Sequence, residues 1–308
     1  MRTIILFLLG FPLMLFAQDH LIRLNYDNDF FSATDQYYTQ GVRLEYIAPV
    51  FGQSPIRHLL LATKNASSVY AGVAIERDGF TPSGIRIVGI PYGDRPYAGT
   101  MFVSPFSIAF NQKKQTRIFS QLDLGMMGPI VGGKEEQTSI HKTIGNILPL
   151  GWEYQIANDV IVNYTTQFEK GVFNREHITL TGFIQGRIGT LYTDASVGTM
   201  LRVGWMNDYF SNLGITKGLD SRKFQLYGFA KGSGKVVGYN ATMQGGLFSE
   251  SIYTLPASSI NRTVAQGSYG VVIAYKRFQL EYTKHYITPE YKNGLTHGWG
   301  HCNISFCF

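Results

Sequence analysis

Three oxygen-bearing side chains stand next to one another at Asp27, Asn28 and Asp29, and the polar run 32–41 follows them. Carboxylates and amide carbonyls are the ligands of hard cations such as Ca²⁺, which takes about 6–8 oxygens. The glycine and distal glutamate of an EF-hand loop do not follow at the required spacing. On the residues alone, two interpretations stay open: a cation site, or a turn between strands that is stabilised by Asx side chains.

A second candidate for chemistry is His141, which lies in the long segment 128–150. Because the pKa of histidine lies near neutrality, such a side chain can act as a general base. Residues 135–146 have helical rather than alternating periodicity, so a short helix is predicted within this loop. A solvated loop histidine without a catalytic role is the alternative, and it also stays open.

The remaining reactive side chains favour structural roles. The turn that contains Asp94 and Arg95 is interpreted as a pair of opposite charges that pins a loop to a rim. His297 and His301 are four residues apart, hence on one face of a strand, and have no cysteine or carboxylate nearby in the sequence. They are expected in the aromatic belt or the lumen rather than in a metal site, and His285, beside Lys284, is expected on the inner wall. The chain contains neither a G-x-S-x-G nucleophile elbow nor a glycine-rich phosphate loop that opens a helix.

These candidates must be positioned by strands, because polar and apolar side chains alternate along most of the chain. Charged residues make up only 16% of the 308 residues and aromatic residues 14%, with 34 glycines; average globular chains have about 25% charged residues. Low charge and alternation are typical of a transmembrane barrel, apolar outside and polar inside. A helical soluble enzyme, a coiled coil and a disordered protein are disfavoured. The net charge of +6 comes without basic clusters, so no nucleic-acid partner is expected.

Thirteen alternating runs can be counted, whereas bacterial single-chain barrels have an even number of strands. We therefore predict an all-β antiparallel transmembrane barrel of twelve strands, with fourteen as the alternative. Short turns are predicted at 112–114, 231–234 and 276–277, and one run is predicted to start at Trp152. Long segments at 78–96, 128–150 and 247–263 are assigned to the opposite rim, and the last strand ends on Phe308.

Residues 1–17 are interpreted as a secretory signal peptide, because one early arginine precedes about 14 uncharged and mostly apolar residues. No later stretch reaches the roughly 18 apolar residues of a transmembrane helix. The exported chain is then one domain, 18–308. The only cysteines, Cys302 and Cys307, are five residues apart and are expected on opposite faces of one strand, without a mutual disulfide.

The polar motifs together resemble the outer-membrane lipid A 3'-O-deacylase family. The matching motifs are Asn28-Asp29, residues 34–41 (TDQYYTQG), residues 93–99 (GDRPYAG), residues 133–137 (GKEEQ) with His141, and residues 151–155 (GWEYQ). They follow one another in the family's order, as far as about residue 168.

The resemblance implies a twelve-stranded barrel with a Ca²⁺-dependent esterase site near its outer rim, which removes the 3'-linked acyloxyacyl group of lipid A. It implies that His141 is the general base that activates water and that Asn28 and Asp29 hold the Ca²⁺. Thr39 would support the site, and Gln137, one helical turn before His141, would line it. The partner would be lipid A of lipopolysaccharide in the outer leaflet, and the protein a monomer embedded in the outer membrane.

The chain departs from the family pattern in two places. Members place a glutamate shortly after the catalytic histidine, where this chain has Asn146-Ile147. The side chains that could replace it are Glu135, Glu136 and Glu153. The family also has a basic residue before the Asp-Arg-Pro turn, to contact the substrate or the oxyanion, and Arg86 is the nearest candidate.

One geometric condition follows from the alternation. Asp27 and Asp29 are expected to face inward and Asn28 outward, so Asn28 and Asp29 can share a site only if the strand ends or bulges there. Two other functions remain as alternatives: a non-enzymatic outer-membrane barrel, either a channel or a lipid-handling scaffold, and an outer-membrane phospholipase.

Overall fold

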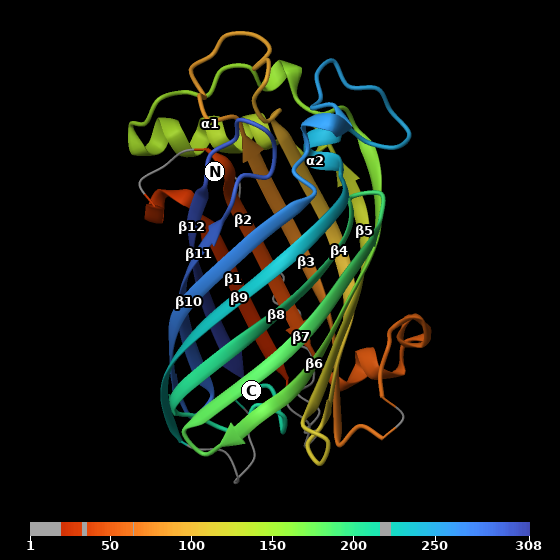
Figure 1. Ribbon diagram of the computed structural model, residues 1–308, viewed down its shortest axis with the longest axis vertical. Coiled ribbons are helices and arrows are strands. Elements are labelled where there is room, and N and C mark those ends of the chain that lie inside the picture. The colour runs from red at the N-terminus through yellow and green to blue at the C-terminus, as the bar shows by residue number, and fades with distance from the viewer. Residues whose placement is uncertain (1–19, 33–35, 64, 216–222) are drawn as a thin grey trace, which may run out of the picture.

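The computed structural model describes residues 20–308 except 33–35, 64 and 216–222, so the signal peptide predicted at 1–17 lies outside the described residues. Twelve antiparallel strands form a closed barrel in which each strand pairs with its neighbours in the chain and β12 pairs with β1 (Figure 1). The strands are β1 (Leu21–Asn28), β2 (Tyr37–Ile47), β3 (Ser68–Thr81), β4 (Ala98–Asn111), β5 (Thr116–Met127), β6 (Asp159–Arg175), β7 (Ile178–Gly189), β8 (Tyr192–Trp205), β9 (Phe224–Asn240), β10 (Thr263–Tyr275), β11 (Phe278–Ile287) and β12 (His297–Cys307).

Short helices occupy the connections. They are η1 (Asp29–Ser32), η2 (Pro49–Gln53), η3 (Pro55–Leu59), η4 (Pro129–Val131), α1 (Gly133–Ile144), η5 (Trp152–Tyr154), α2 (Ala241–Gln244) and η6 (Ala257–Ser259). The helix predicted at 135–146 is therefore confirmed as α1. Among the described residues, no helix combines the length and the apolar character that crossing a membrane requires.

The count of twelve strands is confirmed, and β9 explains the thirteenth run. The turn predicted at 231–234 is wrong, because these residues lie inside β9 and pair with β8 and β10. Gly232 and Gly234 do not interrupt the alternation, and a side chain added at either would meet no atom within 4 Å. The strand predicted to start at Trp152 starts at Asp159 instead, because Trp152 belongs to η5.

Several of the charged side chains inside the barrel form ion pairs. Arg43 bridges Glu45 and Glu76, and the pairs Arg117–Glu169 and Arg187–Asp194 lie on other strands. The outward positions carry exposed apolar side chains on nearly every strand; on β1 they are Ile22, Leu24 and Tyr26. This division explains the low charge of the chain, because the outward positions of the strands are mostly apolar. Cys302 and Cys307 both lie on β12 and are not joined by a disulfide.

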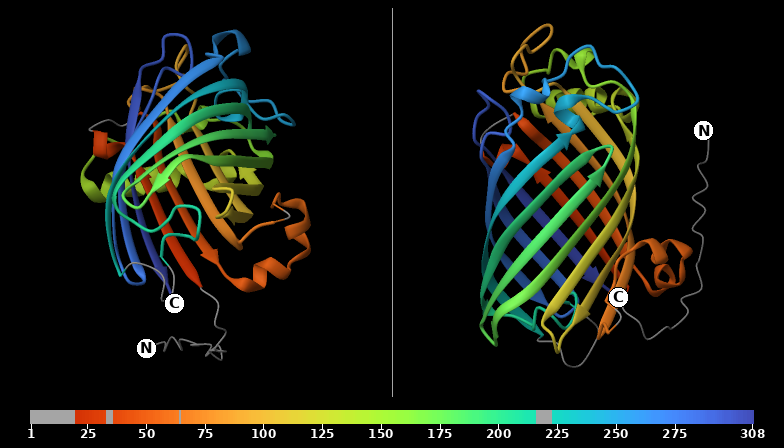
Figure 2. Two further views of the ribbon diagram at one scale, coloured as in Figure 1. Left: turned by 60° about the horizontal axis from the view of Figure 1, so that its bottom comes forward. Right: turned by 45° about the vertical axis from the view of Figure 1, so that its right-hand side comes forward.

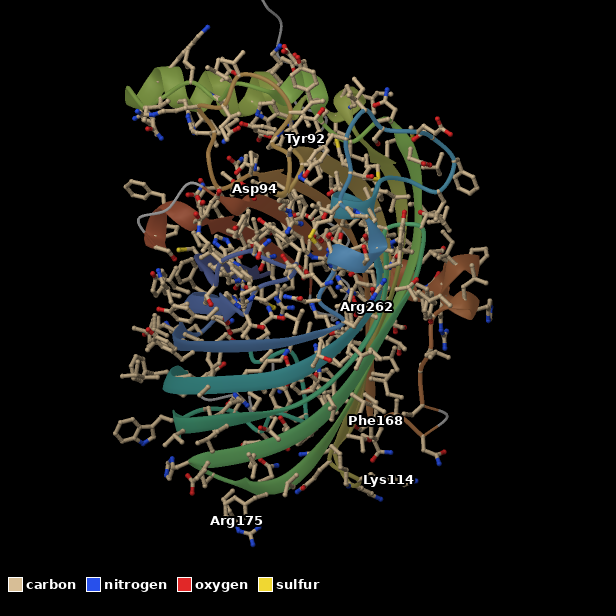
Figure 3. The ribbon with its side chains drawn as sticks, turned by 45° about the horizontal axis from the view of Figure 1, so that its top comes forward. Tyr92, Asp94, Lys114, Phe168, Arg175 and Arg262 are labelled. Carbon is tan, nitrogen blue, oxygen red and sulfur yellow. The ribbon has the colours of Figure 1, made fainter. Side chains whose placement is uncertain are left out.

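The two ends of the barrel differ in their connections. The end with α1 also carries Tyr92 and Asp94, whereas Lys114 and Arg175 lie at the opposite end (Figure 3). Not all connections at that opposite end are short. Helices η2 and η3 stand outside the wall there (Figure 2), and residues 206–215 turn into the barrel, where Ile215 is buried in an apolar cluster.

The Asp-Arg-Pro turn holds the upper loops together, which confirms its structural interpretation in part. Arg95 is 1% exposed, and its Nη1 lies 2.7 Å from Oε2 of Glu290. Its Nη2 donates to Thr242 Oγ1 at 2.6 Å, and its guanidinium lies over the Phe80 ring. The ion-pair partner of Arg95 is thus Glu290, not its neighbour Asp94.

Candidate functional site

The regular strand β1 ends where the candidate cation ligands begin. Asn28 is the last residue of β1, and Asp29 starts the 3-10 turn η1. Asp27 lines the cavity inside the barrel, whereas Asn28 and Asp29 line a second cavity together with the outward-facing Tyr26. The condition that the strand must end or bulge for Asn28 and Asp29 to share a site is met. That site lies on the outer side of the wall.

A bulge brings Thr39 to the same cavity. The register of β2 against β3 shifts between Tyr38 and Gln40, so Thr39 is the extra residue. Its hydroxyl lies 2.7 Å from the hydroxyl of Thr81, and it lines the cavity together with the outward-facing Gln40. Bulges re-aim side chains at barrel rims, and here the bulge turns Thr39 out of the strand alternation.

Helix α1 covers this part of the wall. Its buried residues Gly133, Gln137 and His141 are four apart and form one stripe. The Trp152 indole donates to Gln137 Oε1 at 2.7 Å, and its ring leaves no room for a side chain at Gly133. This packing turns His141 towards the cavity.

A polar contact joins the other side of α1 to the strands. Glu136 accepts a hydrogen bond from Gln40 Nε2 at 3.0 Å, and its second oxygen lies 2.9 Å from Arg77 Nη2. Arg77 lies on β3, one residue before the inward-facing Asp78. The helix is therefore attached to both β2 and β3.

The cavity between α1 and the wall has a volume of about 770 Å³. It brings together all the predicted site residues except Arg86. Its polar lining includes Asn28, Asp29, Thr39, Gln137 and His141, and its apolar lining includes Phe30, Phe31, Ile140 and Ile144. Polar groups that could do chemistry therefore meet an apolar surface that opens to the outside of the barrel.

The end of α1 fixes the ring of His141. Gly145 ends the helix with a left-handed φ of 69°, and the chain turns back. The Ile147 carbonyl oxygen then lies within hydrogen-bond distance of His141 Nδ1. A carbonyl can only accept, so the neutral ring carries its proton on Nδ1 and its lone pair on Nε2. A backbone carbonyl therefore contacts this nitrogen, at the residue after Asn146, in the segment where the resemblance implied a glutamate.

Side-chain oxygen atoms at the cavity are suitable ligands for a hard cation. Asp29 is 2% exposed, and its Oδ2 accepts from Gln36 N at 2.6 Å. Asn28 Oδ1 accepts from Phe30 N at 2.8 Å. Each oxygen has further lone pairs, and these hydrogen bonds fix both side chains at the cavity. Carboxylate and amide oxygens are the ligands that Ca²⁺ prefers.

Four charged candidates do not line the cavity. Arg86 is exposed on the loop between β3 and β4 and does not line the cavity. Glu135 and Glu153 are also exposed, and Glu136 is engaged by Gln40 and Arg77. The cation that reaches α1 is Arg77, which the sequence prediction missed. Its outward position on β3, opposite Val42 and close to the bulge of β2, was the available signal.

The structure also corrects the expectation that His301 has no carboxylate nearby. Its Nδ1 lies 3.0 Å from Oδ1 of Asp27, so a carboxylate partner exists after all. That partner was missed because Asp27 belongs to β1, at the other end of the chain, and β1 pairs with β12 only when the barrel closes.

Comparisons with known proteins agree with the barrel fold. The model of the family described as "Outer membrane protein LpxR" matches residues 3–308. The structure of LpxR from Salmonella typhimurium is similar, with a TM-score of 0.73 and 20% identity over 93% of this chain and 99% of that chain. The beta domain of the Bordetella autotransporter BrkA has a TM-score of 0.47 and 8% identity, over 94% of this chain and 99% of that chain.

No match was found among curated proteins. The family model covers nearly the whole chain, and the closed barrel of twelve strands is the architecture of a multi-pass outer membrane protein. The chain belongs to the LpxR family of outer membrane proteins.

Proposed function

We propose that this protein is a Ca²⁺-dependent lipid A 3'-O-deacylase, an ester hydrolase that releases the 3'-linked acyloxyacyl group. One observation carries the proposal: His141, Asn28 and Asp29 line one cavity on the outer side of the barrel wall. A water-soluble substrate would favour a site in the lumen or in an upper loop. A site that opens towards lipid instead suits a substrate that stays in the membrane.

His141 would be the general base. Its Nδ1 faces the Ile147 carbonyl, so Nε2 takes the proton from a water molecule. The water oxygen then bonds to the ester carbonyl carbon, and the bond from that carbon to the sugar oxygen breaks. The proton passes from Nε2 to the sugar oxygen, and the products are a free fatty acid and a hydroxyl group on the sugar.

Asn28 and Asp29 would hold the Ca²⁺ through their side-chain oxygens. When bound, the ion would supply Lewis-acid stabilisation of the negative charge that develops on the ester oxygen. Thr39 lines the same cavity, and Gln137, which also lines it, accepts a hydrogen bond from the indole of Trp152. These two side chains would orient the reacting groups.

The apolar lining would receive the acyl chain. Phe30 is 75% exposed and Ile144 is 62% exposed, next to the polar groups of the cavity. Burying such side chains against an acyl chain is favourable by about 25 cal/mol per Å² of apolar surface. Arg77, close to α1, and the net charge of +6 suit a substrate that carries phosphates.

The structure of the lumen supports a channel less well than the outer cavity supports an enzyme. Residues 206–215 enter the barrel at the end opposite α1, where Arg23 donates to the Leu213 carbonyl at 3.3 Å. Ser68 also donates to the Ser211 carbonyl, at 3.0 Å. The described part of this connection thus forms a floor in the barrel, which does not favour free passage. A phospholipase would use the same outer cavity, and the test below separates it from the deacylase.

Mass spectrometry of lipid A tests the proposal. Lipid A from cells that express the wild type is expected to lose its 3'-linked chains with Ca²⁺ and to keep them when Ca²⁺ is chelated. His141→Ala is expected to lower the rate by at least about 10²-fold. His177→Ala, an exposed histidine at the opposite end, is the matched control. Unchanged lipid A with the wild type in saturating Ca²⁺ would contradict the proposal, and release of fatty acid from phospholipid vesicles would select the phospholipase.

A further inference from the structure

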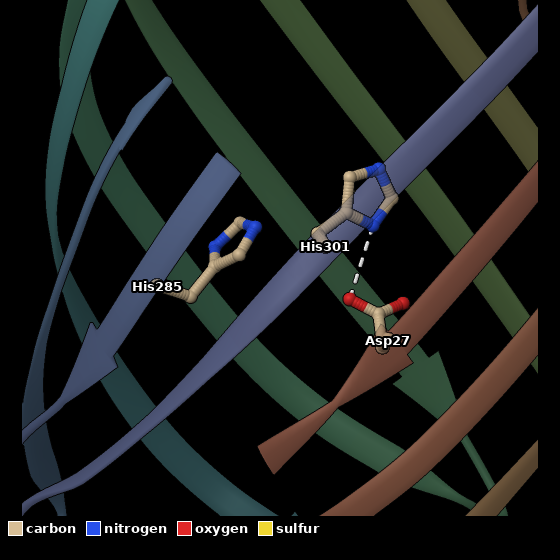
Figure 4. A group of neighbouring side chains, drawn as sticks. All are labelled: Asp27, His285 and His301. Carbon is tan, nitrogen blue, oxygen red and sulfur yellow. Dashed lines mark hydrogen bonds and ion pairs between the residues drawn. The ribbon is translucent and has the colours of Figure 1, made fainter. Parts of the chain in front are cut away.

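Three side chains from three neighbouring strands meet on the inner wall of the barrel: Asp27 of β1, His285 of β11 and His301 of β12 (Figure 4). One ligand atom of each lies within 4.8 Å of the others. All three are partly buried and line an internal cavity of about 610 Å³. None of them belongs to the outer cavity between α1 and the wall.

Strand register produces this cluster. Asp27 pairs with His301 across the β1–β12 seam, and His285 pairs with Trp299, two residues before His301. Residues at such positions on one face of a sheet are neighbours. The cluster therefore forms only when the first and last strands of the barrel pair.

Trp299 supports both ends of the cluster. Its indole donates to Asp27 Oδ1 at 3.1 Å, and its ring stacks on the His285 ring with centroids 4.9 Å apart and an angle of 9°. His301 Nδ1 contacts the same oxygen of Asp27 at 3.0 Å. Metal-binding side chains in proteins are commonly oriented by partners of this kind.

We propose that Asp27, His285 and His301 bind a divalent transition-metal ion such as Zn²⁺. Two imidazoles and one carboxylate are a ligand set that suits Zn²⁺ and related ions. With bonds of about 2.0–2.2 Å, tetrahedral ligands lie roughly 3.3–3.6 Å apart. Small side-chain rotations bring three atoms that lie within 4.8 Å of one another to that spacing. Water from the cavity completes the coordination.

This site differs from the proposed Ca²⁺ site in chemistry and in place. Ca²⁺ prefers oxygen ligands, and two of the three ligands here are nitrogens. Asp27 and Asn28 are adjacent in the chain, but their side chains lie on opposite sides of the wall. An ion bound by Asp27, His285 and His301 would link β1, β11 and β12 where the barrel closes, directly behind the residues of the outer cavity. The proposal of this metal site does not depend on the proposed deacylase activity.

Metal titration of the full protein in detergent micelles tests the proposal. The protein is stripped with a chelator, Ca²⁺ is added in excess, and Zn²⁺ or Co²⁺ is titrated. The wild type is expected to bind one Zn²⁺ that Ca²⁺ does not displace, and Co²⁺ is expected to give a visible spectrum typical of nitrogen ligands. A wild type without such binding would overturn the proposal.

Substitutions assign the ligands. His285→Ala and His301→Ala are expected to weaken Zn²⁺ binding by more than 100-fold, and Trp299→Phe by about 10–100-fold, as for outer-shell partners. His177→Ala removes an exposed histidine and serves as the matched control. Circular dichroism reports whether each barrel is folded, and His301→Gln replaces His301→Ala if the latter does not fold. Equal Zn²⁺ affinity of the wild type and the folded variants at His285 and His301 would show that the proposal is wrong.

Discussion

The two faces of the wall at the upper end of β1 assemble polar side chains in different ways. On the inner face, Asp27, His285 and His301 meet because regular strands pair in register. On the outer face, the residues of the cavity meet because the strands stop being regular: β1 gives way to η1, β2 bulges at Thr39, and α1 brings His141 from far along the chain. Regular pairing gives a rigid cluster, whereas strand irregularities and a covering helix give a site with room for a large ligand.

The largest effect is expected from the carboxylate on the outer face. Asp29→Asn keeps the shape of the side chain but removes its charge, so hydrolysis of lipid A is expected to fall by about 10²–10³-fold, as for the loss of one electrostatic contributor. Mass spectrometry of lipid A measures the rate. Asn25→Ala, an inward-facing substitution on the same strand, is the control and should leave the rate unchanged. An equal fall in the hydrolysis rate of both variants would show that the outer face has no special role in the reaction.

A smaller effect is expected from Zn²⁺ on the stability of the inner face. An ion that binds only the folded barrel stabilises it by about 2.7 kcal/mol when its concentration is 100 times its Kd. Thermal unfolding in detergent should therefore shift upward with Zn²⁺ for the wild type and not for His301→Ala. An equal shift for both proteins would mean that Zn²⁺ acts elsewhere.

The attachment of α1 offers a more modest test of the outer face. Trp152→Phe removes the hydrogen bond to Gln137 and is expected to weaken the docking of α1 by about 1 kcal/mol. Hydrogen exchange of the α1 amides should then rise about fivefold, which corresponds to that free energy. Trp205→Phe, an exposed substitution on β8, is the control. Unchanged exchange in Trp152→Phe would show that this bond does not hold the helix.

The smallest effect is expected from a fall in pH on the stability of the upper loops. Burial alone would raise the pKa of Glu290, but Arg95 and Lys235 outweigh it, and the pKa is lowered. Its contribution to stability is therefore complete above the ordinary pKa of a glutamate, about 4.3, and is lost as the pH falls through the lower value of the folded protein.

Limited proteolysis of the upper loops between neutral and acidic pH measures this loss. Glu290→Gln should show a weaker pH dependence, and Glu250→Gln, an exposed loop residue, should behave like the wild type. An identical pH profile for Glu290→Gln and the wild type would assign the dependence to other groups.

Much of the barrel could be predicted from the sequence, because the alternation of side chains continues along each strand. The error at 231–234 came from treating Gly232 and Gly234 as turn residues. Lys231, Ser233 and Lys235 keep facing inward, so the alternation was the better guide. The local glycine content predicted a turn that does not exist, whereas the period of two predicted the strand correctly.

The outer cavity could be predicted only through its motifs. Neither the contact of His141 with the Ile147 carbonyl nor the position of Arg77 follows from spacing, because both depend on how α1 docks. The inner cluster could not be predicted, because Asp27 and His301 are 274 residues apart and meet only across the seam.

The outward opening of the cavity changes what limits its occupancy. A lipid ligand arrives by lateral diffusion within the leaflet, so its access depends on its mole fraction among the surrounding lipids and not on its concentration in bulk water. Diluting that ligand with an inert detergent at constant total amount should therefore slow the reaction, much as lowering the concentration slows an enzyme in solution. The membrane is at once the solvent of the protein and the compartment from which its cavity is filled.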